Sequence, residues 1–226
     1  MTDLKVFDSV ADLSVALADS VQRWIAEAVE ARGVAHVVLA GGSTPASLHA
    51  VLAERALPWD TLHFYFGDER CVPPDHSDSN YRAAQETLLS RVPVPEEHVH
   101  RMDGEAREQG ARSYRAILPD RFDVVLLGMG EDGHTASLFP GLAAVESEET
   151  VLYISDSPKP PPERITLGLK PLNGARNVGF MVAGAGKASA LSRVRDGEKL
   201  PAARVKPDNG TLTFFADRAA VQSEKL

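Results

Sequence analysis

The feature that most constrains the fold is an apolar run that breaks directly into glycines. The run Phe122–Leu127 has the character of a buried strand, and the segment Gly128–Pro140 that follows it has glycine at positions 128, 130 and 133. In an open α/β sheet, ligands bind beyond the carboxyl ends of the strands, where glycine lets the backbone approach them closely. The segment also carries Asp132 and His134, so we expect a binding site here with His134 as its first candidate residue.

Strand-like runs and helical patterns alternate along the chain. A long amphipathic helix is predicted over Val10–Arg32, because apolar residues recur there near the helical period and Gly33 follows as a stop. Strands are predicted at Ala35–Ala40, Leu62–Phe66, Phe122–Leu127, Thr150–Ile154, Arg164–Leu169, Asn177–Val182 and Leu212–Phe215. Further helices are predicted through Leu48–Leu57, from a cap at Ser79 to about Leu89, and over Glu105–Leu118 and Lys187–Arg195. This order favours an α/β fold, with a mostly parallel sheet flanked by helices on both faces and the loops after its strands on one rim.

Composition and charge narrow the class of protein. The 226 residues contain no linker-like stretch, so we interpret 1–226 as one domain. The lack of an apolar run of membrane-spanning length or a signal-peptide pattern, together with a single cysteine, Cys71, predicts a cytoplasmic protein without a membrane partner. A net charge of -8 argues against a nucleic-acid partner. A monomer is consistent with the sequence, which does not determine the oligomeric state.

The segment Gly41-Gly42-Ser43-Thr44-Pro45 lies between a predicted strand and a predicted helix. Free backbone N–H groups and the positive end of the helix dipole favour an anion such as phosphate at this position. The alternative is ordinary capping, since Ser/Thr followed by Pro is a common helix start. The segment has neither the Walker pattern nor the dinucleotide fingerprint, so nucleotide hydrolysis is disfavoured.

Three cations stand near the ends of other predicted strands. Asp68-Glu69-Arg70 follows the strand Leu62–Phe66, Arg164 opens a strand after a proline run, and Lys187 follows Gly184-Ala185-Gly186 at the start of a helix. Converging cations could hold a small anionic ligand even in an acidic protein. Taken singly, each cation also fits an ordinary surface position, and Asp68–Arg70 also fits a charged turn.

His134 is predicted to be a general base, because an imidazole takes up and releases protons near neutral pH, and Asp132 or Glu131 could orient it. A hydrogen-bonded structural histidine is the alternative. A Ser-His-Asp triad is less attractive, because Ser137 is expected in a helical turn and the chain has no Gly-x-Ser-x-Gly elbow. A metal site is weakly supported, because the histidines at 63, 98, 100 and 134 show no dense ligand spacing.

The ordered set of motifs resembles the glucosamine-6-phosphate isomerase/6-phosphogluconolactonase family. The motifs are Leu39–Pro45, Gly67–Arg70, Ser79-Asn80-Tyr81, Gly128–Pro140, Pro161–Thr166, Gly184–Lys187 and Pro201–Val205, which together span nearly the whole chain. The resemblance implies a Rossmann-like fold of the glucosamine-6-phosphate deaminase/ribose-5-phosphate isomerase type. It also implies hydrolysis of 6-phospho-D-glucono-1,5-lactone to 6-phospho-D-gluconate in the oxidative pentose phosphate pathway, without a metal or other cofactor and with the sugar-phosphate lactone as partner.

Carried over onto matching positions, the resemblance implies His134 as the base that deprotonates water, with Asp132 assisting. It places the substrate or its phosphate near Gly41, Gly42, Ser43, Asp68, Arg70, Arg164 and Lys187. Two alternatives stay open. A glucosamine-6-phosphate deaminase of the same fold is disfavoured because Ser137-Leu138-Phe139-Pro140 stands where that enzyme continues with Asn-Glu-Pro. A non-catalytic sugar-phosphate-binding protein would have no need of His134.

Overall fold

The fold is built on a six-stranded sheet in which every neighbouring pair of strands is parallel. The computed structural model describes residues 3–222, apart from the side chain of Ser43. The strand order is β1 (Asp3–Phe7), β9 (Thr211–Asp217), β8 (Asn177–Val182), β5 (Val124–Gly128), β2 (Ala35–Leu39) and β3 (Leu62–Phe66). The predicted parallel α/β sheet is therefore confirmed, and the edge strand β1 is the member that the sequence patterns did not predict.

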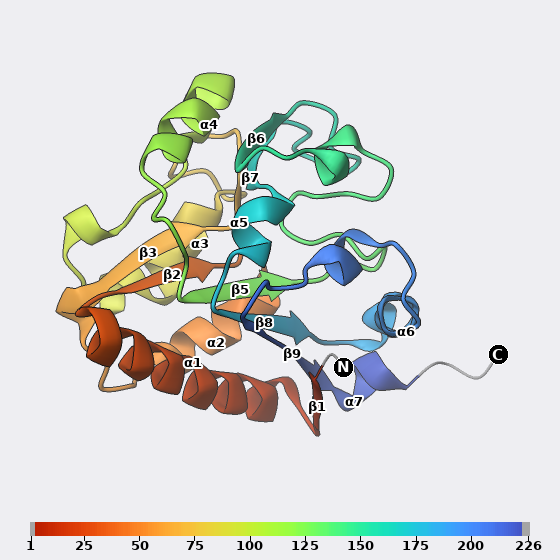
Figure 1. Ribbon diagram of the computed structural model, residues 1–226, viewed down its shortest axis with the longest axis horizontal. Helices are drawn as coiled ribbons and strands as arrows, with labels where there is room; N and C mark the ends of the chain where they lie inside the picture. Colours follow the sequence, from red (N-terminus) through yellow and green to blue (C-terminus); the bar gives the residue numbers. More distant parts are fainter. Residues whose placement is uncertain (1–2, 223–226) are drawn as a thin grey trace.

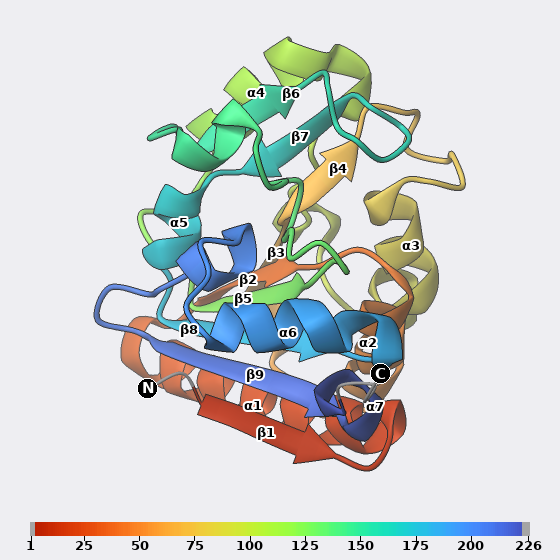
Figure 2. The same cartoon turned by 90° about the vertical axis from the view of Figure 1, so that its right-hand side faces the viewer.

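Helices cover both faces of this sheet, as predicted. Figure 1 shows α1 (Val10–Arg32) and α2 (Ser43–Ala53) on one side and α5 (Leu169–Asn173) on the other, and in Figure 2 α6 (Ala188–Arg195) lies on the same side as α5. The remaining helices are α3 (Asn80–Thr87), α4 (Arg107–Ala116) and the short α7 (Arg218–Val221). Within residues 3–222, no helix combines the length and the apolar character that crossing a membrane requires.

The long helix α1 has the predicted bounds. It begins where the Ser9 hydroxyl accepts a hydrogen bond from the backbone N–H of Asp12, and it ends at Gly33, whose N–H donates to the carbonyl of Val29. Its inward face is fully buried at Leu13 and Leu17. Burial of a leucine side chain contributes about 1.5–3 kcal/mol, so this face fixes the helix against the sheet.

A second sheet corrects the expectation that the later strands extend the main sheet. It has three antiparallel strands in the order β4 (Asp68–Arg70), β7 (Arg164–Leu167) and β6 (Val151–Ile154). A parallel pair needs a long crossover connection, whereas only a short proline-rich loop joins β6 to β7, so the chain folds back on itself. Figure 2 shows this sheet with α4 above the main one. The sequence patterns are consistent with Asp68–Arg70 as either rim residues near a ligand or a charged turn, and do not predict that they form the edge strand β4.

The strand order places a topological switch between β2 and β5. From β2 the chain passes through α2 to β3 on one side, whereas β5 lies on the other side of β2 and is followed outward by β8 and β9. Connections that leave in opposite directions open a crevice beyond the carboxyl ends of the two strands. The glycine-bearing segments after β2 and β5 both border this crevice.

Candidate functional site

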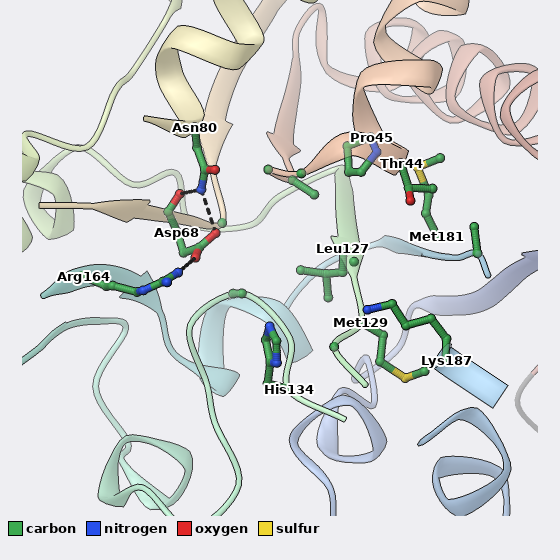
Figure 3. A pocket seen from close by; sticks show the side chains of 18 of the residues that line it. Thr44, Pro45, Asp68, Asn80, Leu127, Met129, His134, Arg164, Met181 and Lys187 are labelled. Atoms are coloured by element: carbon green, nitrogen blue, oxygen red, sulfur yellow. Dashed lines mark hydrogen bonds and ion pairs between the residues drawn. The ribbon is translucent and has the colours of Figure 1, made fainter. Parts of the chain in front are cut away.

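A cavity of about 340 Å³ occupies this crevice beyond β2, β3, β5 and β8. Its lining includes Gly41, Gly42, Asp68, Arg70, His134, Arg164 and Lys187, which are seven of the residues predicted from the sequence. Figure 3 shows His134, Arg164 and Lys187 around it, with Asp68 and Asn80 on the Arg164 side and Thr44 and Pro45 opposite. The side chain of Ser43 lies outside the described part of the structure, so its predicted contact stays a prediction.

His134 sits on a tight loop after β5. The backbone N–H of Gly130 donates to the carbonyl of His134 at 2.8 Å, and the N–H of Gly133 donates to the carbonyl of Gly130 at 3.0 Å. A Cβ atom at Gly130 would lie 2.0 Å from His134 Nδ1 and 2.5 Å from Asp132 Oδ1. Only glycine at position 130 therefore lets this histidine and its carboxylate partner pack against the turn.

The carboxylate of Asp132 is the hydrogen-bond partner of the His134 imidazole. Its Oδ1 lies 2.5 Å from His134 Nδ1 and also accepts a hydrogen bond from the backbone N–H of His134 at 3.1 Å. When the imidazole is neutral, this contact puts the ring proton on Nδ1 and leaves the lone pair of Nε2 free. Glu131, the other residue considered for this role, instead places its carboxylate against Gly186.

The surroundings of His134 keep it neutral at neutral pH. Burial lowers the pKa of His134, and the hydrogen bond to Asp132 partly opposes that shift. For Asp132, burial acts to raise the pKa, but the hydrogen bonds from His134 outweigh it and the pKa is lowered. A neutral imidazole beside an ionised carboxylate is the state in which a histidine can accept a proton.

Arg164 is a buried cation, and sequence reasoning had weighed it as a surface residue. It is 5 % exposed. Its guanidinium donates to the carbonyls of Pro161 at 3.0 Å, Pro160 at 3.1 Å and Lys159 at 3.2 Å, and lies 3.8 Å from Asp68. Burial lowers the pKa of Arg164, yet a guanidinium stays charged in proteins. A charge held in this way is available to an anion in the cavity.

Arg70 stands directly opposite Arg164 in the β4–β7 pair. Like charges in register across a strand pair repel each other, and the carboxylate of Asp68, 3.8 Å from Arg164, offsets part of this repulsion. The Nε of Arg70 is buried and has no hydrogen-bond partner among the described residues, while one terminal nitrogen donates to the carbonyl of Asp78 at 2.5 Å. Arg70 lines the cavity, so it places a second cation beside Arg164 there.

Asp68 lines the cavity, but neighbouring side chains occupy its carboxylate. Ser137 Oγ donates to it at 2.6 Å and Asn80 Nδ2 at 3.1 Å, and Arg164 lies alongside. These contacts favour a role in holding Arg164 over direct contact with a phosphate, which its charge would repel. Its predicted role in substrate binding stays a prediction.

Ser137 is not the nucleophile of a triad, but the structural reason differs from the helical turn that was expected. It is fully buried and its hydroxyl faces Asp68, away from the Asp132–His134 pair. The expected helical turn is wrong: Ala136 and Ser137 form a tight turn between the bridged residues Thr135 and Leu138. Ala136 has a φ of 47° there and lines the cavity, and such backbone strain is characteristic of functional sites.

The opposite wall of the cavity combines a lysine with a helix start. Lys187 is the last residue of a short 3-10 turn, Ala185–Lys187, and α6 begins at Ala188, one residue after the predicted helix start. In Figure 3 its ammonium group points towards the cavity beside Met129. No side chain caps α2 at Gly42, so the first N–H groups of this helix remain available to an anion.

Two contributors were missed by the sequence reasoning. Asn80 donates to the Asp68 backbone carbonyl at 2.8 Å, and a Cβ at Gly41 would lie 1.9 Å from its Oδ1, so Gly41 is required by this close approach. The motif Ser79-Asn80-Tyr81 was the available signal. Lys159 places its Nζ 4.0 Å from Asp132 Oδ2, and its place in a proline run gave no signal.

Comparison with known proteins decides the family. The model of the family "Glucosamine-6-phosphate isomerases/6-phosphogluconolactonase" matches residues 8–214. The chain belongs to this family. A 6-phosphogluconolactonase of Rattus norvegicus is 40% identical over 97% of this chain and 92% of its own. The crystal structure of 6-phosphogluconolactonase from Thermotoga maritima superposes with a TM-score of 0.89 at 31% identity, covering 96% of this chain and 100% of that one.

A solved structure of lower sequence identity shares the fold. A monomeric glucosamine-6-phosphate deaminase superposes with a TM-score of 0.84 at 20% identity, covering 98% of this chain and 100% of that one. The predicted Rossmann-like fold of this type is therefore confirmed. Among residues 3–222, no three His, Cys, Asp or Glu side chains form a group that could hold a metal ion.

Proposed function

We propose that this protein is a 6-phosphogluconolactonase, which hydrolyses 6-phospho-D-glucono-1,5-lactone to 6-phospho-D-gluconate in the oxidative pentose phosphate pathway. The observation that carries the proposal is the oriented His134–Asp132 pair in the same cavity as Arg70, Arg164 and Lys187. A general base can activate water for attack on the carbonyl group of a lactone, and the nearby cations can bind the phosphate of the same substrate. The names of the rat and Thermotoga relatives support the same activity.

In the proposed mechanism, Nε2 of His134 takes a proton from water while Asp132 stabilises the imidazolium that forms. The resulting hydroxide attacks the lactone carbonyl carbon, and backbone N–H groups of the glycine-rich loops are candidates to stabilise the oxyanion. When the bond from the carbonyl carbon to the ring oxygen breaks, the imidazolium returns its proton to that oxygen. Neither a metal nor an enzyme-bound intermediate is required, and the free carboxylic acid then ionises.

We assign the phosphate to the cationic side chains and the start of α2. Arg164 and Arg70 approach from the small sheet, and Lys187 approaches from the other wall. Together with the uncapped N–H groups after Gly42 they form a set of charge-assisted donors, which phosphate oxygens favour. This arrangement would hold the lactone ring at a fixed distance from His134, and positioning is a large part of catalysis.

The rival deaminase activity is disfavoured by the segment after the histidine. Leu138 and Phe139 are fully buried there, and the ring of Phe139 lies 4.5 Å from that of His134. Buried apolar side chains cannot transfer protons to an amino sugar. We also propose that the protein acts in the cytoplasm, where a single cysteine such as Cys71 stays reduced.

The test is to generate the lactone in place with glucose-6-phosphate dehydrogenase and to follow its loss above the spontaneous rate. Acceleration by the wild-type protein that His134→Ala abolishes is the expected result. A folded wild-type protein that gives no acceleration would overturn the proposal, and ammonia release from glucosamine 6-phosphate would then be measured. Ligand binding without turnover in either assay would favour a sugar-phosphate-binding protein.

A separate measurement tests the phosphate site. Lys187→Ala should raise KM with a much smaller change in kcat, because it removes a contact made equally in the ground and transition states. Lys170→Ala, at an exposed position outside the cavity, is the matched control. An unchanged KM, shown to be a binding constant, would remove Lys187 from the phosphate site.

A further inference from the structure

A second cavity of about 200 Å³ lies between the end of α6, the turn Pro201–Arg204 and the start of β9. Figure 2 shows the chain leaving α6, forming this turn and returning into β9. None of its lining residues lines the first cavity. The turn also contains most of the motif Pro201–Val205, which the proposed reaction leaves without a role.

The rim of this cavity is cationic in a protein of net charge -8. Four cationic side chains line it, namely Arg195, Lys199, Arg204 and Lys206, against a single carboxylate, Glu198. That carboxylate is already paired with Arg193, at 2.6 and 2.5 Å, and Arg204 is paired with Glu146. Among residues 3–222 no ion pair engages Arg195, Lys199 or Lys206, so the local charge is positive.

The floor of the cavity is apolar. Val194, Val205 and Phe214 are buried in the lining, and Leu212 is partly buried beside them. A cationic rim over an apolar floor fits a ligand with a phosphate at one end and a carbon skeleton at the other. The volume is smaller than that of the first cavity, which favours a small organic phosphate over a nucleotide.

The turn that walls this cavity also touches the loop that carries His134. The backbone N–H of Ala202 donates to the carbonyl of Gly133 at 3.0 Å. On the same loop, a Cβ at Gly133 would lie 2.7 Å from a methyl carbon of Leu200, so the two segments are in close contact. A shift of the turn would therefore displace the residue between Asp132 and His134.

We propose that the second cavity binds a small organic phosphate and that its occupation changes the setting of the Asp132–His134 pair through Ala202 and Gly133. The phosphate takes its donors from Lys199, Lys206 and Arg195, and the carbon skeleton lies on the apolar floor. This proposal does not depend on which reaction takes place in the first cavity.

The test is a titration of backbone amide NMR signals with inorganic phosphate and with glucose 6-phosphate. The expected result is saturable shifts at Gly197 and Lys206, with Gly133 and His134 following the same binding curve. The double variant Lys199→Ala/Lys206→Ala should weaken phosphate binding at least about tenfold, since it removes two charge-assisted hydrogen bonds to the phosphate. The control Lys5→Ala/Lys170→Ala removes the same charge elsewhere and should leave the curve unchanged.

Lys187→Ala separates the two cavities, because it weakens phosphate binding in the first cavity alone. Shifts at Gly197 and Lys206 that persist in this variant support the second site. Shifts confined to Gly41 and Gly42, or equal affinity in the Lys199→Ala/Lys206→Ala and control proteins, would overturn the proposal. Equal affinity for inorganic phosphate and glucose 6-phosphate would contradict the proposal that the ligand is an organic phosphate. Saturation of the second cavity without a shift of the Gly133 signal would contradict the proposed coupling to the Asp132–His134 pair.

Discussion

His134 and a cluster of four other histidines lie at opposite edges of the main sheet. His134 follows the carboxyl end of β5 and has an oriented carboxylate at 2.5 Å. The histidine cluster, which we define as His36, His63, His98 and His100, lies near the amino-terminal ends of β2 and β3. In the cluster, the imidazoles have mainly one another as neighbours.

The contacts within the histidine cluster are stacked rings and one imidazole–imidazole hydrogen bond. The rings of His63 and His98 stack at 4.0 Å, and His63 Nδ1 lies 3.0 Å from His100 Nε2. Asp123 is near His36, but Arg32 and Arg176 already neutralise this carboxylate. Burial and, to a smaller extent, the neighbouring histidines together lower the pKa of His63 to about 4.

The difference shows what a carboxylate partner does for a buried histidine. Burial disfavours the imidazolium in both places. At His134 the hydrogen bond to Asp132 restores part of the proton affinity and fixes the tautomer, so the ring can act as a base. In the cluster, burial lowers the pKa of His36, His63 and His100, and within residues 3–222 none of these rings has a side-chain hydrogen bond to a carboxylate, so they serve packing.

The largest expected effect comes from removing the base itself. His134→Ala should lower kcat by about 10²–10⁴-fold, the range typical of a lost general base, with KM changed much less. His100→Ala removes a histidine from the cluster and should keep kcat near the wild-type value. Steady-state kinetics on both folded variants make the comparison, and wild-type kcat in His134→Ala would contradict the assignment.

Removing only the carboxylate should have a smaller effect. Asp132→Asn should lower kcat about tenfold to a hundredfold, because the partner that fixes the tautomer is weakened. Since Asp132 raises the pKa of His134, its loss should also move the acid limb of the kcat/KM profile to lower pH. A pH profile of unchanged position would show that Asp132 acts through structure alone.

We expect the histidine cluster to make the stability of the protein depend on pH, without affecting catalysis. Because the pKa of His63, His36 and His100 is lowered in the folded protein, the unfolded state binds more protons below the ordinary histidine pKa. The free energy of unfolding should therefore fall as the pH drops from about 7 to about 5. Since these side chains are partly exposed, we expect His63 to account for only about 0.5–1 kcal/mol of that fall.

Urea unfolding of the wild type and of His63→Phe, followed across this pH range, measures the effect. The variant should show a shallower pH dependence, because its aromatic ring keeps the stacking and cannot take up a proton. Equal slopes for the two proteins would remove His63 from the explanation. Carboxylates also titrate in this pH range in both proteins. The contribution of His63 is therefore the difference between the pH dependence of the wild type and that of the variant.

The smallest effect should come from the lysine beside Asp132. Lys159 acts to lower the pKa of both His134 and Asp132. Lys159→Ala should therefore shift the acid limb of the kcat/KM profile to higher pH and leave the plateau close to wild type, whereas Lys159→Arg should keep the wild-type profile. A lower plateau with an unshifted limb would indicate a structural role.

Local sequence patterns were sufficient for much of the main sheet and for the centre of the site. The helix Val10–Arg32 and the strands Leu62–Phe66 and Asn177–Val182 have the predicted bounds. The hydrophobic periodicity and the terminating residues of these elements involve only a few neighbouring residues, so they can be recognised from the sequence alone. The pair Asp132 and His134 is equally local, because a two-residue spacing across a glycine brings the side chains together.

Contacts between distant segments were decided only by the tertiary structure. Pairing of β4 with β7 made a strand of Asp68–Arg70, for which a charged turn was one alternative, and buried Arg164 against Asp68. The bond from Ser137 to Asp68, the histidine cluster and the cationic second cavity likewise join segments far apart in the chain. The sequence by itself determined the strands, the helices and the chemistry available at their ends. Which charges share a cavity depends on strand order and on burial, and neither is encoded within a local window of residues.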